Sequence, residues 1–309
     1  MSADGGGDEE AASGDMCCAG CGIAGIDEIK LTKCDACDLV RYCSVECQED
    51  HEPKHKEECK KRAAELRDEL LFKQPEGNHL GDCPICCVLL PNDVNKCALQ
   101  LCCSKVICKG CFIANLLTER KQKLKPKCPF CREPLKKSQA KIYKNTMKRI
   151  AANDPVATFQ FAIDCNKAGD HTKAFEYFTK AAALGDAEAH LRLAEMYHNG
   201  AGVEKNEEKE IYHLEEATIG GHPRARHNLG AHEGIKCNFE RSIKHFVIAA
   251  NQGHEGSMKA LMGEGGYPRD FITKEELAAT LRTHKAAVKA MNTPERVKTE
   301  ASLGMLGLN

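Results

Sequence analysis

The chain has 309 residues, a formal net charge of −1 at pH 7, and a composition ordinary for a soluble protein, with 42% hydrophobic and 29% charged residues. A charge this close to zero argues against attraction of the whole chain to nucleic acid or to membranes. No apolar run is long enough to span a bilayer. The first fifteen residues are acidic and glycine-rich, unlike the basic and apolar regions of a secretory signal. We therefore expect a cytoplasmic or nuclear protein, neither secreted nor transmembrane, with two or three domains.

Cysteine is the most informative residue type, because 18 of the 20 cysteines lie between Cys17 and Cys131. Many of them recur as Cys-x-x-Cys pairs, the spacing at which two thiolates reach one tetrahedral zinc ion. A disulfide framework could use the same residues, but it requires an oxidising compartment. We therefore predict zinc sites rather than disulfides.

The first cysteine group spans residues 18–59 and reads C-x2-C, C-x2-C, C-x3-C and H-x3-C. In the last two pairs the ligands stand four residues apart, which puts them on one face of a helix. We expect a second helix to begin at Pro53, which suits a first helical turn, and to run to about Phe72. A segment this short cannot fold on buried apolar surface alone. Structural zinc, at roughly 10–16 kcal/mol apparent per site, would supply the missing stability.

This group resembles the MYND zinc finger. The motifs that carry the resemblance are Cys18-Ala-Gly-Cys21, Cys34-Asp-Ala-Cys37, Arg41-Tyr-Cys-Ser-Val-Glu-Cys-Gln48 and His55-Lys-Glu-Glu-Cys59. The family's interleaved pairing implies one zinc on Cys18, Cys21, Cys43 and Cys47, and another on Cys34, Cys37, His55 and Cys59. MYND fingers commonly bind proline-rich peptides; this chain has His51-Glu52 where the family usually carries Asp-Trp, so peptide binding is left open. We interpret His51 as a solvated surface histidine and leave Cys17 unassigned.

The second cysteine group spans residues 83–131. It resembles a RING finger in Cys83-Pro-Ile-Cys86, Cys102-Cys-Ser-Lys-Val-Ile-Cys-Lys-Gly-Cys111 and Cys128-Pro-Phe-Cys131, with Lys105 where many RING fingers place a histidine. The family's cross-brace implies one zinc on Cys83, Cys86, Cys108 and Cys111, and another on Cys102, Cys103, Cys128 and Cys131. Cys97 is an alternative ligand, Cys87 is interpreted as a thiol packed nearby, and a structural zinc ribbon is the alternative fold. Together the two groups predict four Zn²⁺ ions.

RING fingers hold a ubiquitin-charged conjugating enzyme in a reactive pose, so their contribution is positioning and we assign no catalytic residue. By resemblance, Ile85 is the apolar contact for the conjugating enzyme and Pro129 shapes the neighbouring loop. Arg132 matches the linchpin arginine that hydrogen-bonds conjugating enzyme and ubiquitin together. Asn115 departs from the family because it stands where a large apolar residue is usual, with Leu116 and Leu117 as candidate substitutes.

The second half of the chain contains internal repeats. Gly185, Gly221 and Gly253 are spaced 36 and 32 residues apart, and periods of this size indicate a solenoid of helix pairs. The segments 193–203 and 208–217 together are similar to one Sel1-type repeat, a family that shares the tetratricopeptide superhelix. Such arrays offer a protein-binding face. We interpret their scattered histidines as solvated or helix-surface residues. The predicted units start near Asp154, Asp186, His222 and His254.

The predicted fold is therefore mainly α, with two small cross-braced zinc-finger modules followed by an α-solenoid of Sel1-like helix pairs. The predicted order is a disordered acidic tail (1–16), a MYND-type finger (17–59), a helical linker (60–81), a RING-type finger (82–133), a basic linker (134–152), Sel1-like repeats (153–291) and a flexible tail (292–309). We interpret the basic linker as solvated surface rather than as a phosphate-binding segment.

The leading functional hypothesis is a RING-type E3 ubiquitin ligase. In it the repeats bind a protein substrate, the RING recruits a ubiquitin-conjugating enzyme, and the MYND finger adds a further protein contact. The competing hypotheses are a non-catalytic zinc-finger scaffold and a zinc-dependent nucleic-acid binder. We expect no nucleic-acid binding at physiological salt, because the basic linker offers Tyr143 as its only aromatic residue for stacking.

Overall fold

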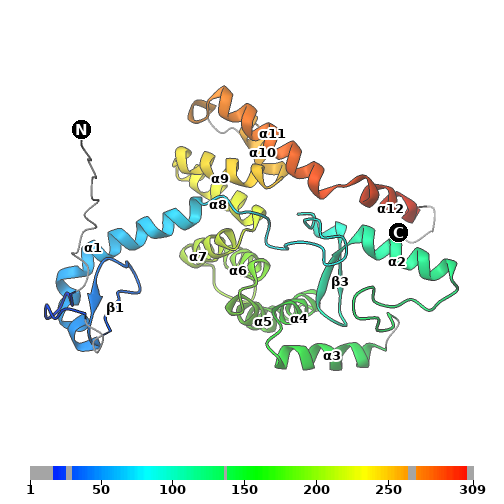
Figure 1. The fold of residues 1–309 in the computed structure, drawn as a ribbon, viewed down its shortest axis with the longest axis horizontal. Helices are drawn as coiled ribbons and strands as arrows, with labels where there is room; N and C mark the ends of the chain where they lie inside the picture. The colour runs from blue at the N-terminus through cyan, green and yellow to red at the C-terminus, as the bar shows by residue number, and fades with distance from the viewer. Residues whose placement is uncertain (1–16, 26–29, 136–137, 264–268, 305–309) are drawn as a thin grey trace, which may run out of the picture. The chain divides into compact units, whose positions relative to one another are not determined.

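The computed structural model describes residues 17–25, 30–135, 138–263 and 269–304, so the predicted acidic tail at 1–16 lies outside the described residues. The chain divides into two compact units, residues 1–73 and residues 74–309. Helices dominate the described chain, as the sequence predicted (Figure 1). None of the helices in the described ranges is long and apolar enough to cross a membrane.

The first unit joins a small sheet to one long helix. Strands β1 (Thr32–Lys33) and β2 (Arg41–Tyr42) pair antiparallel. Helix α1 (Val45–Phe72) begins after Ser44, whose hydroxyl accepts a hydrogen bond from a backbone N–H of the first turn. The prediction that a second helix begins at Pro53 is wrong, because Pro53 lies inside the continuous helix α1. Proline lacks the N–H that an interior helical residue donates, so α1 is one hydrogen bond short at this point.

The second unit begins with the second cysteine-rich module. A short 3₁₀ helix, η1 (Val94–Lys96), leads into the hairpin of β3 (Cys97–Gln100) and β4 (Lys105–Cys108). These strands pair antiparallel with their ends in register, and α2 (Lys109–Lys121) follows β4 directly. The core of this module is small and half of it is cysteine: Cys83, Leu90, Ile107 and Cys108.

Helices α4 to α9 form the consecutive pairs of the predicted solenoid. Buried alanines that are fully shielded from solvent, such as Ala162, Ala174 and Ala181, let the helices approach closely. The pairs are α4 (Pro155–Lys167) with α5 (His171–Ala183), α6 (Ala187–Asn199) with α7 (Glu207–Ile219), and α8 (Pro223–Ile235) with α9 (Phe239–Asn251). The last two helices, α10 (Glu255–Leu261) and α11 (Lys274–Met291), both pack mainly on α9.

The predicted starts of the four units coincide with helix N-caps. Asp154, Asp186, His222 and His254 each accept a hydrogen bond from a backbone N–H in the first turn of the helix that follows. An N-cap acceptor satisfies donors that the helix leaves unpaired at its start, and aspartate is a preferred residue there. In the third and fourth units an imidazole nitrogen performs the same task. These two histidines are therefore not the solvated surface residues that we expected from the sequence.

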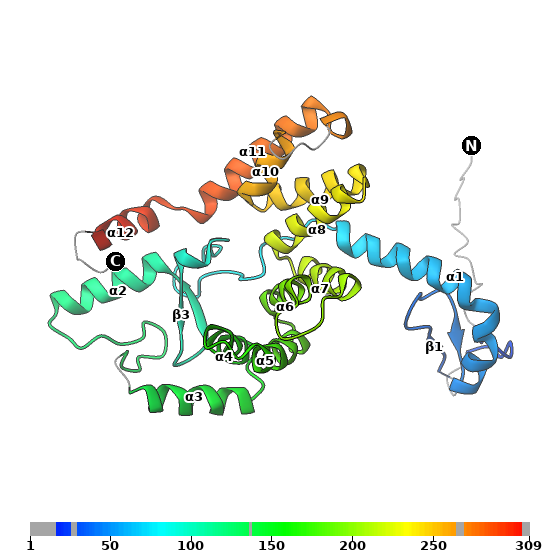
Figure 2. The ribbon, with the colours of Figure 1, turned by 180° about the vertical axis from the view of Figure 1, so that it is seen from behind.

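The segments that flank the repeats are helical. The basic linker contains α3 (Gln139–Ala151), which packs on α4. Residues 292–309 were expected to be a flexible tail, but α12 (Pro294–Gly304) is a helix and packs against α2 of the second module, side by side in both views (Figure 1 and Figure 2). The expectation failed because the contact joins parts of the chain that are far apart in sequence.

Candidate metal centres

The structure brings the sixteen predicted ligands together as four groups of four. Within each group, the ligand atoms all lie within 4.8 Å of one another. The groups are Cys18, Cys21, Cys43 and Cys47; Cys34, Cys37, His55 and Cys59; Cys83, Cys86, Cys108 and Cys111; and Cys102, Cys103, Cys128 and Cys131. These are the sets that the two resemblances implied. The alternative ligand Cys97 does not belong to any of them, and neither do the unassigned Cys17 and the spare thiol Cys87.

The spacing of the donor atoms fits zinc. Four sulfurs at 2.3 Å from a tetrahedral ion would lie about 3.8 Å apart. The Sγ–Sγ distances are 3.5 Å for Cys21 and Cys43, and 3.7 Å for Cys34 and Cys59. In the second module, pairs of sulfurs lie 3.3 to 3.9 Å apart. Every cysteine is a free thiol, whereas a disulfide would hold two sulfurs at about 2.05 Å. The four groups are thus consistent with bound Zn²⁺ and not with disulfides.

Four of the five Cys-x-x-Cys pairs form the same tight turn, while the fifth, Cys108 and Cys111, stands at the start of helix α2. The residue after the second cysteine donates its backbone N–H to the carbonyl of the first cysteine, at 2.8 to 3.0 Å, and takes a positive φ of 53° to 76°. This conformation is natural for glycine and uncommon for other residues. It explains Cys87, which is exposed at such a position rather than packed as the predicted nearby thiol. The four residues are Gly22, Asp38, Cys87 and Arg132.

Comparison with known proteins agrees with part of this organisation. Residues 18–59 match the MYND finger family model, and residues 164–186, 187–222 and 223–254 match the Sel1 repeat model. The chain carries a MYND finger and Sel1 repeats. No RING family model matches the second module, and no curated protein is significantly similar to the chain.

The solved structures similar to this chain include the following two. One is a Sel1 repeat protein from Oxalobacter formigenes, with 19% sequence identity and a TM-score of 0.42, covering 57% of this chain and 72% of that one. The other is a protective antigen present in uropathogenic Escherichia coli strains, which displays an SLR fold. It has 24% identity and a TM-score of 0.39, and the match covers 53% of this chain and 35% of that one.

Two thiols of the first MYND zinc group differ in how readily they ionise. Hydrogen bonds shared with Cys21 and Cys18 raise the pKa of Cys43 to about 12. Burial raises the pKa of Cys18, but backbone hydrogen bonds from Cys21, Cys43 and Gly20 outweigh it and bring the pKa to about 6. Neighbouring thiols thus compete for charge. A bound zinc ion removes this competition, because it stabilises all of its thiolates together.

His51 supports the MYND finger from outside the ligand set. Its Nδ1 lies 3.1 Å from the hydroxyl of Tyr42, a buried residue, and its ring stacks on that of the ligand His55 at 5.7 Å between centroids. The interpretation of His51 as a solvated surface histidine is therefore wrong. The contacts of His51 with Tyr42 and His55 do not affect the spacing of the zinc ligands, so they could not be predicted from the sequence.

In the second module, the residues implied to contact a conjugating enzyme lie at the surface. Ile85 is 41% exposed, and Arg132 is exposed as well. Pro129 is half-buried, beside Phe130, which is 46% exposed. The amide of Asn115 donates a hydrogen bond to the carbonyl of Lys127 at 3.2 Å. Leu116 and Leu117, the candidate substitutes for an apolar residue at position 115, are both half-buried.

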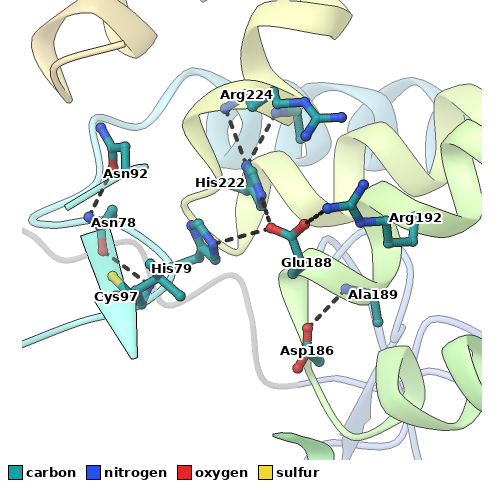
Figure 3. A network of polar contacts seen from close by, with 12 residues as sticks. Asn78, His79, Asn92, Cys97, Asp186, Glu188, Ala189, Arg192, His222 and Arg224 are labelled. Carbon is teal, nitrogen blue, oxygen red and sulfur yellow. Dashed lines mark hydrogen bonds and ion pairs between the residues drawn. The ribbon is translucent and has the colours of Figure 1, made fainter. Parts of the chain in front are cut away.

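A fifth group of metal-ligating side chains joins the second module to the Sel1 repeats. His79 and His222 both direct a ring nitrogen at the carboxylate of Glu188, as Figure 3 shows. Nε2 of His222 lies 2.7 Å from Glu188, and Nε2 of His79 lies 3.6 Å from it. Arg192 binds the other carboxylate oxygen at 2.7 Å. Burial opposes ionisation of Glu188, yet the hydrogen bond from His222, together with the nearby His79 and Arg192, brings its pKa well below the usual range.

Two features of this fifth group argue against a metal ion. Nδ1 of His222 accepts the N–H groups of Arg224 and Ala225, so a neutral ring must carry its proton on Nε2, the atom that faces Glu188. The rings of His79 and His222 are also stacked, 3.9 Å between centroids and 13° from parallel. Lone pairs in two parallel ring planes do not converge on one ion. The group is better described as a buried polar contact that fastens residues 74–97 to the repeats.

Nothing in the sequence singled out His79, because its partners Glu188 and His222 lie more than 100 residues away. The position of His222 carried a usable signal. It is equivalent to Asp186 and Asp154 in the earlier units, where a helix cap is required. That equivalence predicts a buried capping role for His222. We missed it because we interpreted all the histidines of the repeats together as solvated or helix-surface residues.

Proposed function

We propose that this protein is a RING-type ubiquitin ligase, in which the second module recruits a conjugating enzyme and the Sel1 repeats bind a protein substrate. The observation that carries the proposal is the interleaving of the ligands in residues 83–131. The first and third cysteine pairs share one group, and the second and fourth share the other. A zinc ribbon, the alternative fold, would join pairs without this crossing. Interleaving is the arrangement that the RING resemblance implies.

The surface of the module supports the same proposal. Ile85, which precedes a zinc ligand, and Phe130, which lies between two ligands, leave apolar surface for a partner. The side chain of Arg132 makes no hydrogen bond or ion pair to any part of the chain that the structure describes, so its guanidinium is available to ligands. A planar guanidinium suits simultaneous hydrogen bonding to two partners. Such contacts would act by positioning the charged conjugating enzyme.

One groove on the repeats is a candidate surface for a substrate. Segment 74–97 covers part of the array, since Gln252 donates to the carbonyl of Gly77 at 2.9 Å and accepts from Asn92 at 2.7 Å. A cavity of about 300 Å³ lies elsewhere, between α6, α7 and α8. Its rim combines Ile235, which is 81% exposed, with the His198–Glu210 pair at 3.0 Å. We propose this groove as the substrate-binding surface, because mixed apolar and charged rims suit protein partners.

A non-catalytic scaffold is the second candidate, and Asn115 is the observation that favours it. RING fingers usually offer a large apolar side chain at this position, whereas here an amide is engaged with the backbone at Lys127. If that apolar contact is essential, the module binds proteins without recruiting a conjugating enzyme.

The two candidates are separated by ubiquitin discharge from a panel of charged conjugating enzymes, measured with the purified full chain. A ligase accelerates discharge from at least one enzyme, and Ile85→Ala reduces that acceleration. Val94→Ala is the matched control, because Val94 is an exposed apolar residue of the same module that adjoins no zinc ligand. Failure of the wild type with every enzyme of the panel, while zinc content is complete, would favour the scaffold.

A further inference from the structure

Arg296 of α12 is a buried cation that reaches the second module from the far end of the chain. Arg296 is only 5% exposed. Nη2 donates to Sγ of Cys86 at 3.2 Å, across 210 residues of sequence, and to the carbonyl of Val88 at 2.8 Å. Nη1 donates to the carbonyls of Leu89 and Met291 at 2.7 and 2.8 Å. The guanidinium therefore ties a zinc-binding turn to the end of α11.

The electrostatics of the nearest zinc group explain why a cation would lie there. Four thiolates around one Zn²⁺ leave two negative charges that the protein must accommodate. In this group Cys83 and Cys108 are shielded from water, with 0% and 1% exposure. Buried charge is costly unless it is paired and hydrogen-bonded. N–H donors to a metal-bound sulfur lower that cost and fix the orientation of the ligand.

A glycine in α2 makes the approach of α12 feasible. A Cβ atom on Gly110 would lie 3.1 Å from Cα of Arg296 and 3.3 Å from its Cγ. Glycine inside a helix is otherwise unfavourable, so close packing accounts for its presence here. A second contact supports the same docking, because Nζ of Lys96 donates to the side-chain oxygen of Asn292 at 2.9 Å.

We propose that Arg296 is the hydrogen-bonding counter-ion of the zinc site formed by Cys83, Cys86, Cys108 and Cys111, and that α12 thereby completes the second zinc module. The affinity of this one site for zinc then depends on a residue beyond the end of the repeats. A chain that keeps all eight cysteine ligands of the module but lacks Arg296 holds this zinc more weakly. The proposal rests on zinc binding and is independent of ligase activity.

The test is the release of zinc from the full chain to a chromogenic chelator, followed over time. Replacing Arg296 by Met keeps an apolar stem and removes every donor. We expect one zinc ion per chain to leave about ten-fold faster or more, since loss of such outer contacts typically weakens metal binding by that factor. Arg296→Lys, which keeps the charge, is expected to give an intermediate rate. Arg282→Met, at an exposed position of α11, is the matched control and should release zinc like the wild type.

Unchanged release from Arg296→Met would overturn the proposal. If that variant fails to fold, Arg296→Lys decides by ¹¹³Cd NMR of the cadmium-substituted protein. A change in the N–H···S contact shifts one cadmium resonance, the one assigned to this site by its loss in Cys86→Ser. Four resonances at wild-type positions in Arg296→Lys would show that Arg296 does not act on the metal site.

Discussion

The MYND finger and the second zinc module have similar ligand arrangements but different support. The MYND finger lies in a compact unit of its own, with a buried core of Cys18, Cys34, Cys37 and Tyr42, so three of its four core residues are zinc ligands. The second module belongs to the same unit as the repeats and is fastened to them through His79, Gln252 and Arg296. The first module therefore depends on its metal for a core, whereas the second also draws on contacts outside its own sequence.

Removal of zinc is expected to separate the two modules most clearly. We predict four zinc ions per chain by elemental analysis. Chelation should unfold the MYND finger completely, because it loses roughly 10–16 kcal/mol apparent per site. The second module should lose its ordered turns, while the Sel1 repeats keep their own hydrophobic cores, such as that of Phe161 and Phe178. NMR amide spectra recorded before and after chelation would show this. Loss of the repeat resonances together with the MYND resonances would contradict it.

Alanine at two glycines sharpens the comparison. A Cβ on Gly20 would lie 2.6 Å from the carbonyl oxygen of Cys47, inside the MYND finger's own zinc site. A Cβ on Gly110 would press on Arg296 in α12 at 3.1 Å. We expect Gly20→Ala to cost the MYND finger its zinc, and Gly110→Ala to destabilise the second unit by about 1–3 kcal/mol. Zinc content and thermal unfolding measure the two effects. Gly110→Ala should be neutral or stabilising if α12 does not dock, because alanine favours helix by about 1 kcal/mol.

The sequence could predict what depends on local spacing. The ligand pairs follow from short-range spacing, whereas their assembly into four interleaved groups was implied by the resemblances to MYND and RING fingers. The starts of the repeat units at Asp186 and His222 follow from the period of about 32 to 36 residues. It could not predict contacts whose partners are backbone carbonyls or distant side chains. Arg296 binds three carbonyls and one thiol, and such partners leave no pattern in the sequence. We therefore predicted a flexible tail at residues 292–309.

Replacing Arg132 by glycine tests whether this residue of the second module positions the conjugating enzyme or only shapes the zinc-binding turn. Its φ of 62° is unfavourable for a residue with a side chain. Arg132→Gly should therefore hold the zinc turn at least as well as the wild type, and it should still lower ubiquitin discharge about ten-fold, because the guanidinium is lost. Asp38→Gly, at the equivalent position of the MYND finger, is the control and should leave discharge unchanged. Equal discharge by Arg132→Gly and wild type would remove the linchpin assignment.

Acid should affect the repeats through their buried histidines. Burial, with smaller contributions from His227, His222, Arg224 and His284, lowers the pKa of His254 from 6.5 to about 4. The unfolded chain then binds more protons than the folded one between these values, so stability is complete above pH 6.5 and falls as the pH drops towards 4. We expect His254 to account for about 2 kcal/mol of loss between pH 6.5 and pH 5. Calorimetry of wild type and His254→Asn measures it, and an equal pH dependence in both would refute the assignment.

The smallest expected effect concerns nucleic acid, and it tests whether the second module adds a binding surface that the MYND finger lacks. A cavity of about 820 Å³ lies beside the zinc ligands Cys102 and Cys103. It is lined by Lys105, Lys141 and Lys148, but Glu133 and Asp154 line it too and reduce its positive potential. Binding through phosphate contacts alone weakens steeply with salt, and two exposed rings, Phe130 of the module and Tyr143 of α3, offer little stacking. We therefore expect no measurable affinity for single- or double-stranded oligonucleotides at physiological salt. Fluorescence anisotropy would test this, with Lys141→Glu/Lys148→Glu as the comparison. A submicromolar affinity that this double variant abolishes would contradict the prediction. It would mean that the cavity lined by Lys105, Lys141 and Lys148 is the module's main binding surface.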